Sequence, residues 1–210
     1  MKRREFALTL ASASLLPLAA RAAVEPVEGR QYTKVSSPQP VLVAGKTEVI
    51  EFFGYWCPHC NELEPSLEAW IKKLPADVNF RRIPVAWQAM HQPYQQLFYA
   101  LEAMGVNPEI HGKVFRAVHT ERLRLDTEPG MAAFAKANGL DAAKLADVMK
   151  SFTVASKCQV ATKAFKTFGI DGVPTLVVDG RYMTSPGLAG GEAPTLEVVE
   201  ALMRKGKSGR

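Results

Sequence analysis

The sequence has few cysteines, and it lacks an apolar run long enough to span a membrane. Of its three cysteines, Cys57 and Cys60 stand only three positions apart. The apolar, small-residue segment 6–20 is too short for a membrane helix, and Pro17 interrupts it. The chain also lacks internal repeats and low-complexity segments, and 47% of its residues are hydrophobic, so a folded globular protein is expected.

The N-terminal segment has the order of a secretory signal. Lys2, Arg3 and Arg4 precede the apolar run, and Ala20-Arg21-Ala22, with small residues on both sides of the arginine, supplies a cleavage site. We therefore expect residues 1–22 to be a signal peptide that is cleaved near position 22. The pair Arg3-Arg4 also resembles a twin-arginine signal, so both export routes stay open, and each ends outside the cytoplasm.

A strong excess of one charge is also missing. The whole chain carries a formal net charge of +5, but without residues 1–22 it has 22 basic and 20 acidic side chains. The remaining charge of about +2 makes no electrostatic case for nucleic acid, so no nucleic-acid partner is expected.

Two stretches around the cysteine pair predict the centre of the fold. Residues 47–55 are β-rich and almost continuously apolar, which is typical of a strand buried on both faces of a sheet. Apolar residues at helical spacing from Leu63 to Leu74 predict a helix that ends at Pro75, with a kink at Pro65. Residues 77–85 predict a second core strand, and residues 32–35 a short one.

The period of the sequence then changes twice. From about residue 88 to 168 apolar residues recur at helical spacing, with breaks at glycines. Strand character returns at 175–178, Asp179-Gly180 signals a tight hairpin into 181–184, and 195–205 predicts a last helix. This order predicts an α/β unit with a helical insertion.

The Cys-x-x-Cys pair carries the chemistry. Between a buried strand and a helix, the first sulfur lies at the helix N-terminus, where free N–H groups and the helix dipole stabilise a thiolate. Cys57 is therefore the expected nucleophile, and Cys60, one turn later, the residue that resolves a mixed disulfide. Pro58 suits the first helical turn and His59 can place positive charge beside Cys57, so both favour the reduced form and make the disulfide a strong oxidant.

Two other roles for the cysteine pair, a zinc site and a structural disulfide, have less support from the residues alone. A zinc site needs two more ligands, and the remaining candidates, Cys158, His91, His111 and His119, show no knuckle-like spacing. A structural disulfide across so short a loop would add little stability. No metal and no cofactor are therefore expected.

The residues 51–60, Glu-Phe-Phe-Gly-Tyr-Trp-Cys-Pro-His-Cys, together with Val173-Pro174-Thr175, resemble the DsbA family of oxidoreductases. The resemblance covers nearly the whole chain after the signal. It implies a thioredoxin-like fold with an inserted helical domain: 23–86 and 165–210 forming the thioredoxin-like domain, and 87–164 the insertion. It also implies that Cys57 and Cys60 form a redox-active disulfide.

The same resemblance implies roles for three more residues. Pro174 would be a cis-proline opposite the active site, and Val173 its neighbour that touches the substrate backbone. Glu51 would be a buried acid beneath the active site, with Arg82 where the family has a lysine, which affects how freely Glu51 exchanges a proton. From the residues alone, Pro174 could be an ordinary trans-proline and Glu51 a polar residue at a strand edge.

The remaining candidates have ordinary explanations. Cys158 lies on an apolar stripe and is expected to be a small buried hydrophobe. His91, His111 and His119 are explained equally well by surface or cap positions. Tyr55, Trp56 and Val173 could form an apolar surface beside Cys57 that binds unfolded chains, although the two aromatic residues could equally be core.

The sequence thus predicts a dithiol oxidase that donates the Cys57–Cys60 disulfide to reduced, unfolded exported proteins. By resemblance its compartment is a bacterial periplasm and its oxidant a membrane quinone oxidoreductase of the DsbB type; a monomer is expected. A disulfide isomerase or a reductant of the same fold is the nearest alternative, and a metal carrier or a holdase is a more distant one.

Overall fold

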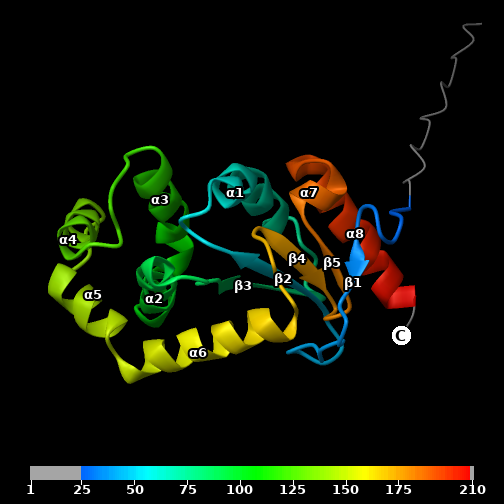
Figure 1. Cartoon of the computed structure of the whole chain (residues 1–210), viewed down its shortest axis with the longest axis horizontal. Coiled ribbons are helices and arrows are strands. Elements are labelled where there is room, and N and C mark those ends of the chain that lie inside the picture. Colours follow the sequence, from blue (N-terminus) through cyan, green and yellow to red (C-terminus); the bar gives the residue numbers. More distant parts are fainter. Residues whose placement is uncertain (1–24, 209–210) are drawn as a thin grey trace, which may run out of the picture.

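A computed structural model describes residues 25–208, so the expected signal peptide lies outside the described residues. A five-stranded sheet with the order β1-β5-β4-β2-β3 forms its centre (Figure 1). The strands are β1 (Thr33–Lys34), β2 (Thr47–Phe53), β3 (Val78–Pro84), β4 (Thr175–Val178) and β5 (Tyr182–Thr184). Each strand expected from the sequence is therefore present.

Strand β2 is an interior strand of the sheet because it pairs on both sides. It runs parallel to β3, with Glu51 opposite Arg82, and antiparallel to β4, with Phe52 opposite Thr175. All seven of its residues are buried, as its continuous apolar character predicts. The strand before the cysteine pair thus lies inside the sheet, between β4 and β3.

The helices fall into two groups. Helices α1 (Pro58–Ile71), α7 (Pro186–Ala189) and α8 (Glu192–Ser208) lie along one side of the sheet (Figure 1). The segment between β3 and β4 is helical, with a 3₁₀ turn η1 (Ala89–His91), α2 (Gln92–Ala103), α3 (Asn107–His119), α4 (Glu128–Ala137), α5 (Ala142–Met149) and α6 (Phe152–Thr167). Figure 1 shows α6 running from this helical group back to the sheet. Its range includes residue 164, where the insertion was expected to end.

Several helix ends differ from the predicted ones. Helix α1 stops at Ile71 rather than Pro75, and α8 covers 192–208 rather than 195–205. The short helix α7 was not expected; it begins where the Ser185 hydroxyl accepts a hydrogen bond from the Leu188 N–H. Local caps and tertiary packing decide such ends, and apolar spacing does not report them.

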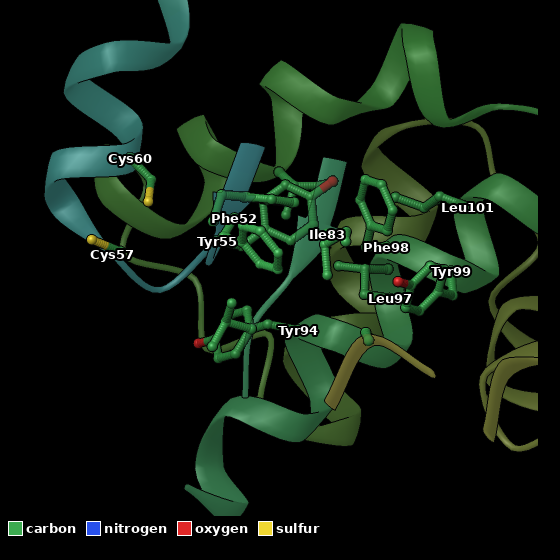
Figure 2. Packing of buried hydrophobic residues seen from close by; sticks show 14 of the residues in the cluster. Phe52, Tyr55, Cys57, Cys60, Ile83, Tyr94, Leu97, Phe98, Tyr99 and Leu101 are labelled. Atoms are coloured by element: carbon green, nitrogen blue, oxygen red, sulfur yellow. The ribbon is translucent and has the colours of Figure 1, made fainter. Parts of the chain in front are cut away.

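Two apolar cores cover the two faces of the sheet. On one face, Val49 of β2 packs with Leu63 and Leu67 of α1 and with Leu202 of α8. The other core contains Ile50 and Phe52 and continues into the helical insertion. Figure 2 shows part of this larger core, which reaches the first turn of α1. The helices between β3 and β4 therefore share a core with the strand and helix that flank the cysteine pair.

None of the helices within residues 25–208 is long and apolar enough to cross a membrane.

The predicted hairpin at Asp179-Gly180 gives a test of the fold. Both residues have positive φ, 50° and 63°, and the Arg181 N–H donates to the Val178 carbonyl, which makes a type I′ turn. A Cβ on Gly180 would also overlap the Gln39 carbonyl oxygen.

We predict that Gly180→Ala lowers the free energy of unfolding by about 2–5 kcal/mol, from left-handed strain plus overpacking. Gly105→Ala is the matched control, because Gly105 has a φ of 74° and open space around it. It should lose only about 1–2 kcal/mol. Equal losses in urea unfolding would contradict the close contact at Gly180.

Candidate functional site

The cysteine pair occupies the first turn of α1, at the end of the central strand. Cys57 is the N-cap residue, with φ −88° and ψ 120°, and Pro58 takes the first helical position. The Cys57 N–H donates to the Gly54 carbonyl at 3.0 Å, which closes a β-turn between β2 and α1. Both cysteines are free thiols, and Figure 2 shows their side chains together beside the buried core.

The surroundings separate the two sulfurs chemically. A hydrogen bond from the Cys60 thiol lowers the pKa of Cys57 to about 6, with help from the N–H groups of Cys60 and His59 and against the effect of burial. Burial raises the pKa of Cys60 well above its usual value. Cys57 is thus a thiolate at neutral pH and Cys60 a thiol, as the sequence predicts for nucleophile and resolving residue.

Pro58 and His59 form the exposed surface over the pair. The His59 Nδ1 lies 2.9 Å from the Glu62 carboxylate, and this hydrogen bond raises the pKa of His59. A protonated His59 in turn favours the Cys57 thiolate through its charge. The arrangement agrees with the expectation that this residue places positive charge beside the nucleophile.

The segment opposite the pair also has the expected geometry. The Val173–Pro174 peptide bond is cis, so the alternative of an ordinary trans-proline is wrong. The Cys57 Sγ lies 3.3 Å from the Val173 carbonyl oxygen, to which Cys57 can donate a hydrogen bond when it is protonated. Residues 116 positions apart in the chain therefore face each other at the reactive sulfur.

A buried cluster of charged groups lies next to the pair. Arg82 of β3 contacts three carboxylates, with distances of 2.9 Å to Glu51, 3.1 Å to Glu64 and 2.9 Å to Glu68. Glu51 has no exposed surface and its Oε1 has no hydrogen-bond partner. The alternative reading of Glu51 as a polar residue at a strand edge is wrong, because β2 is paired on both sides.

Burial keeps some of these acids protonated. It raises the pKa of Glu51 to about 7 and that of Glu64 to about 8, although Arg82 opposes both shifts. One arginine cannot neutralise three carboxylates, so the cluster holds an exchangeable proton near neutral pH. The Glu51 charge also acts on Cys60, so the cluster is electrostatically linked to the resolving cysteine.

Three histidines expected at surface or cap positions all contact the segment before Cys57, and one of them, His91, does hold a cap position as the N-cap residue of α2. His111 is 4% exposed, and its Nδ1 lies 2.7 Å from the Tyr55 hydroxyl oxygen. The His119 Nε2 lies 2.8 Å from the Tyr55 carbonyl oxygen, and the His91 ring stacks on Trp56 at 3.8 Å. The helical period of α3 could have shown that His111 and His119 share the face of its apolar residues, but not what that face contacts.

The apolar surface beside Cys57 differs in part from the expected one. Tyr55 is 1% exposed and belongs to the core, whereas Trp56 is half-buried. Trp87 and Met90, which follow β3, are 39% and 59% exposed. Trp87 packs edge-on against Trp56, so residues from the start of the helical segment extend the surface.

The third cysteine lies away from this site. Cys158 on α6 is half-buried against the larger core, and burial raises its pKa to about 11. It packs against the core as its apolar stripe predicts, but it is only partly buried and not the fully buried residue expected. In the described part of the chain no three or more His, Cys, Asp or Glu side chains are grouped so as to hold a metal ion.

Comparison with family models places the chain among proteins of this architecture. The model of the DSBA-like thioredoxin domain matches residues 77–193, and the thioredoxin model matches residues 32–95. Together they cover the sheet, the helical segment and the cysteine pair. They bear out the predicted thioredoxin-like α/β fold.

Relatives match over almost their whole length. The thiol:disulfide interchange protein DsbA of Bordetella parapertussis is 42% identical over 205 residues, which is 97% of this chain and 98% of the relative. The DsbA of Pseudomonas aeruginosa is 40% identical over 93% of this chain and 92% of its own. A crystal structure of Pseudomonas aeruginosa DsbA superposes with a TM-score of 0.83, at 38% identity, over 88% of this chain and 96% of that one.

The low pKa of Cys57 gives a prediction about its neighbour. Cys60→Ala removes the largest cause of the shift, so the pKa of Cys57 should rise by about one to two units. Cys60→Ser keeps a hydroxyl donor and should leave most of the shift in place. The thiolate absorbance near 240 nm, followed from pH 3 to 10, measures both. A pKa that is the same in the two variants would contradict the hydrogen bond from Cys60.

The raised pKa of Glu51 makes stability depend on pH in a defined direction. Its folded value of about 7 lies above the usual value of about 4.3, so the stabilisation is present at low pH and is lost as pH rises through 7. As the pH rises from 4.5 to 8, the free energy of unfolding of Glu51→Gln should therefore increase relative to that of wild type by roughly 2–3 kcal/mol, because only the wild type loses the stabilisation.

Urea unfolding of the reduced proteins across this range measures the effect. Glu197→Gln, on the exposed face of α8, is the control and should follow the wild type at every pH. A constant difference between Glu51→Gln and wild type would show that Glu51 is ionised throughout.

Proposed function

The chain belongs to the DsbA family of thiol:disulfide oxidoreductases, and we propose that it acts as the dithiol oxidase that donates a Cys57–Cys60 disulfide to newly exported proteins. The observation that carries this proposal is the unequal environment of the two sulfurs. Cys57 lies at the helix N-terminus with a pKa of about 6, while Cys60 is buried and has a raised pKa.

Exchange proceeds in two displacements. A substrate thiolate attacks the Cys57 sulfur of the oxidised pair, the Cys57–Cys60 bond breaks, and Cys60 leaves as a thiolate that takes up a proton. A second substrate thiolate then attacks the substrate sulfur of the mixed disulfide and releases Cys57. The substrate loses two electrons as its disulfide forms, and the pair gains them.

The environment of Cys57 favours the second displacement. A thiol with a low pKa is a good leaving group, and the released thiolate keeps its hydrogen bonds to Cys60 and to the helix N–H groups. The same bonds stabilise the reduced state, which makes the disulfide oxidising. Glu51, next to Cys60, supplies a group of suitable pKa to exchange the Cys60 proton.

The surface around the pair supports a role for Val173 and Pro174 in holding the substrate. A substrate strand that lies beside Val173 would bring its cysteine to Cys57, because the Cys57 Sγ lies 3.3 Å from the Val173 oxygen. Trp56, Trp87 and Met90 form an apolar surface that can bind the apolar side chains exposed by unfolded chains.

The compartment and partners follow from the same proposal. Residues 1–22 act as an export signal, and the mature protein works as a monomer in a bacterial periplasm. A membrane quinone oxidoreductase of the DsbB type reoxidises it. The protein needs no metal or cofactor, because the cysteine pair carries the electrons.

Equilibration of the mature protein with glutathione buffers tests the direction of exchange. Free thiols of the Cys57–Cys60 pair are tagged and counted by mass, with Cys158→Ala as background so that only the pair reports. We expect the pair to stay reduced at oxidised-to-reduced glutathione ratios that oxidise thioredoxin. A thioredoxin-like low potential would turn the assignment toward a reductant.

The roles of the two sulfurs are separable in the same background. Cys57→Ser should abolish oxidation of a reduced substrate protein, whereas Cys60→Ser, mixed with a substrate disulfide, should accumulate a covalent adduct through Cys57. An adduct that forms through Cys60 in the Cys57→Ser variant would contradict the proposed order of attack. Activity that survives the loss of both cysteines would instead indicate a holdase.

A further inference from the structure

The β-turn that carries Cys57 is held in place from outside the sheet. Its four residues are Gly54 to Cys57, closed by the bond from the Cys57 N–H to the Gly54 carbonyl. Tyr55 and Trp56 are the central residues, and their common peptide plane takes no part in the turn's own hydrogen bond. The Tyr55 carbonyl on this plane therefore needs a partner elsewhere.

His119 supplies that partner from the last residue of α3. Its Nε2 lies 2.8 Å from the Tyr55 carbonyl oxygen, and because a carbonyl can only accept, the Nε2 carries the proton. The two residues are 64 positions apart, and the histidine belongs to the helical segment rather than to the sheet. The orientation of the central peptide thus depends on a donor from the insertion.

Two further histidines hold the side chains of the same turn. The buried Tyr55 hydroxyl is paired with His111, about two turns before His119 on α3, and the Trp56 indole is stacked on His91 at an interplanar angle of 9°. The Trp56 Nε1 also donates to the Val85 carbonyl at 3.3 Å. The central side chains are therefore already fixed, and the peptide between them is held by His119 alone among the side-chain hydrogen bonds of the described residues.

The orientation of this peptide matters for Cys57. Turning the plane over converts the turn toward type II, which requires positive φ at its third residue, and that residue is Trp56. Trp56 is not among the positive-φ residues of residues 25–208, so the observed turn has the other orientation. A changed plane would shift the Cys57 N-cap relative to α1 and to Val173.

We propose that His119 is a positioning residue for disulfide exchange, whose Nε2–H holds the turn so that the Cys57 sulfur faces both the helix N-terminus and the Val173 carbonyl. This inference rests on the proposed function of Cys57 as the attacked sulfur. It gives the helical insertion a part in the reaction, because the turn is oriented by a side chain that the insertion carries.

The test compares two substitutions at one position. His119→Leu removes the donor, whereas His119→Gln can place its Nε2 amide near the same oxygen. We expect His119→Leu to lower the second-order rate constant for oxidising a reduced two-cysteine peptide by about tenfold or more, since misplacement of reacting groups by about 1 Å can cost that much. His119→Gln should retain a rate within about threefold of wild type. The pKa of Cys57 should rise in His119→Leu and stay near the wild-type value in His119→Gln.

Controls separate positioning from stability and from the function itself. Arg116→Leu, an exposed change in the last turn of the same helix, should leave the rate and the pKa unchanged. If His119→Leu does not fold, His119→Asn, whose shorter side chain cannot reach the carbonyl, replaces it. Wild-type protein that fails to oxidise the peptide would sink the proposed function.

If the wild type is active, each of three results would overturn the proposed role of His119 and leave the proposed function intact. One is a His119→Leu variant that exchanges at the wild-type rate. Another is a variant that loses stability in urea but keeps both its rate and its Cys57 pKa, which would make His119 merely structural. The third is His119→Gln failing as badly as His119→Leu, which would show that the hydrogen bond is not what the position supplies.

Discussion

The hydrogen bonds that converge on the Cys57 sulfur are the interaction on which the other parts of the structure depend. They come from the Cys60 thiol and from N–H groups in the first turn of α1, and they require the sulfur to sit at the N-cap of that helix. The central strand β2, the turn that follows it and the loop carrying Val173 all meet at this point. Their packing serves to keep one thiolate stable without exposing its neighbour Cys60.

A buried acid cluster lies next to this site, and burial opposes the ionisation of its carboxyl groups. Arg82 binds three carboxylates but cannot neutralise them, so Glu51 and Glu64 take up protons near neutral pH. Arginine stays charged throughout, and the proton shared by the acids is therefore the mobile one. The stability of the fold and the chemistry of Cys60 are linked through the same group of side chains.

Local signals were sufficient for much of the fold and for the reactive pair. The buried strand β2, the helix after it and the Asp179-Gly180 hairpin each have a strong pattern, and all were predicted, although β2 ends at Phe53 and not at residue 55. Helix ends were predicted less well, as α7 and the true limits of α8 show, because capping side chains and neighbouring elements decide them. The helical period of α3 could place His111 and His119 on its apolar face, but no local signal showed which groups these two histidines, or His91, contact.

The sequence by itself determined the cysteine pair, its Pro-His spacer and the strand-to-helix setting, because these are short-range features with a direct effect on thiol chemistry. Only the tertiary structure decided which distant groups complete the site. It brought Arg82 to Glu51 through the register of β2 and β3, and His119 to the Tyr55 carbonyl through the packing of α3. Contacts between residues far apart in the chain depend on how whole helices and strands pack together. A single sequence shows which face of an element is apolar, but not which element packs against that face.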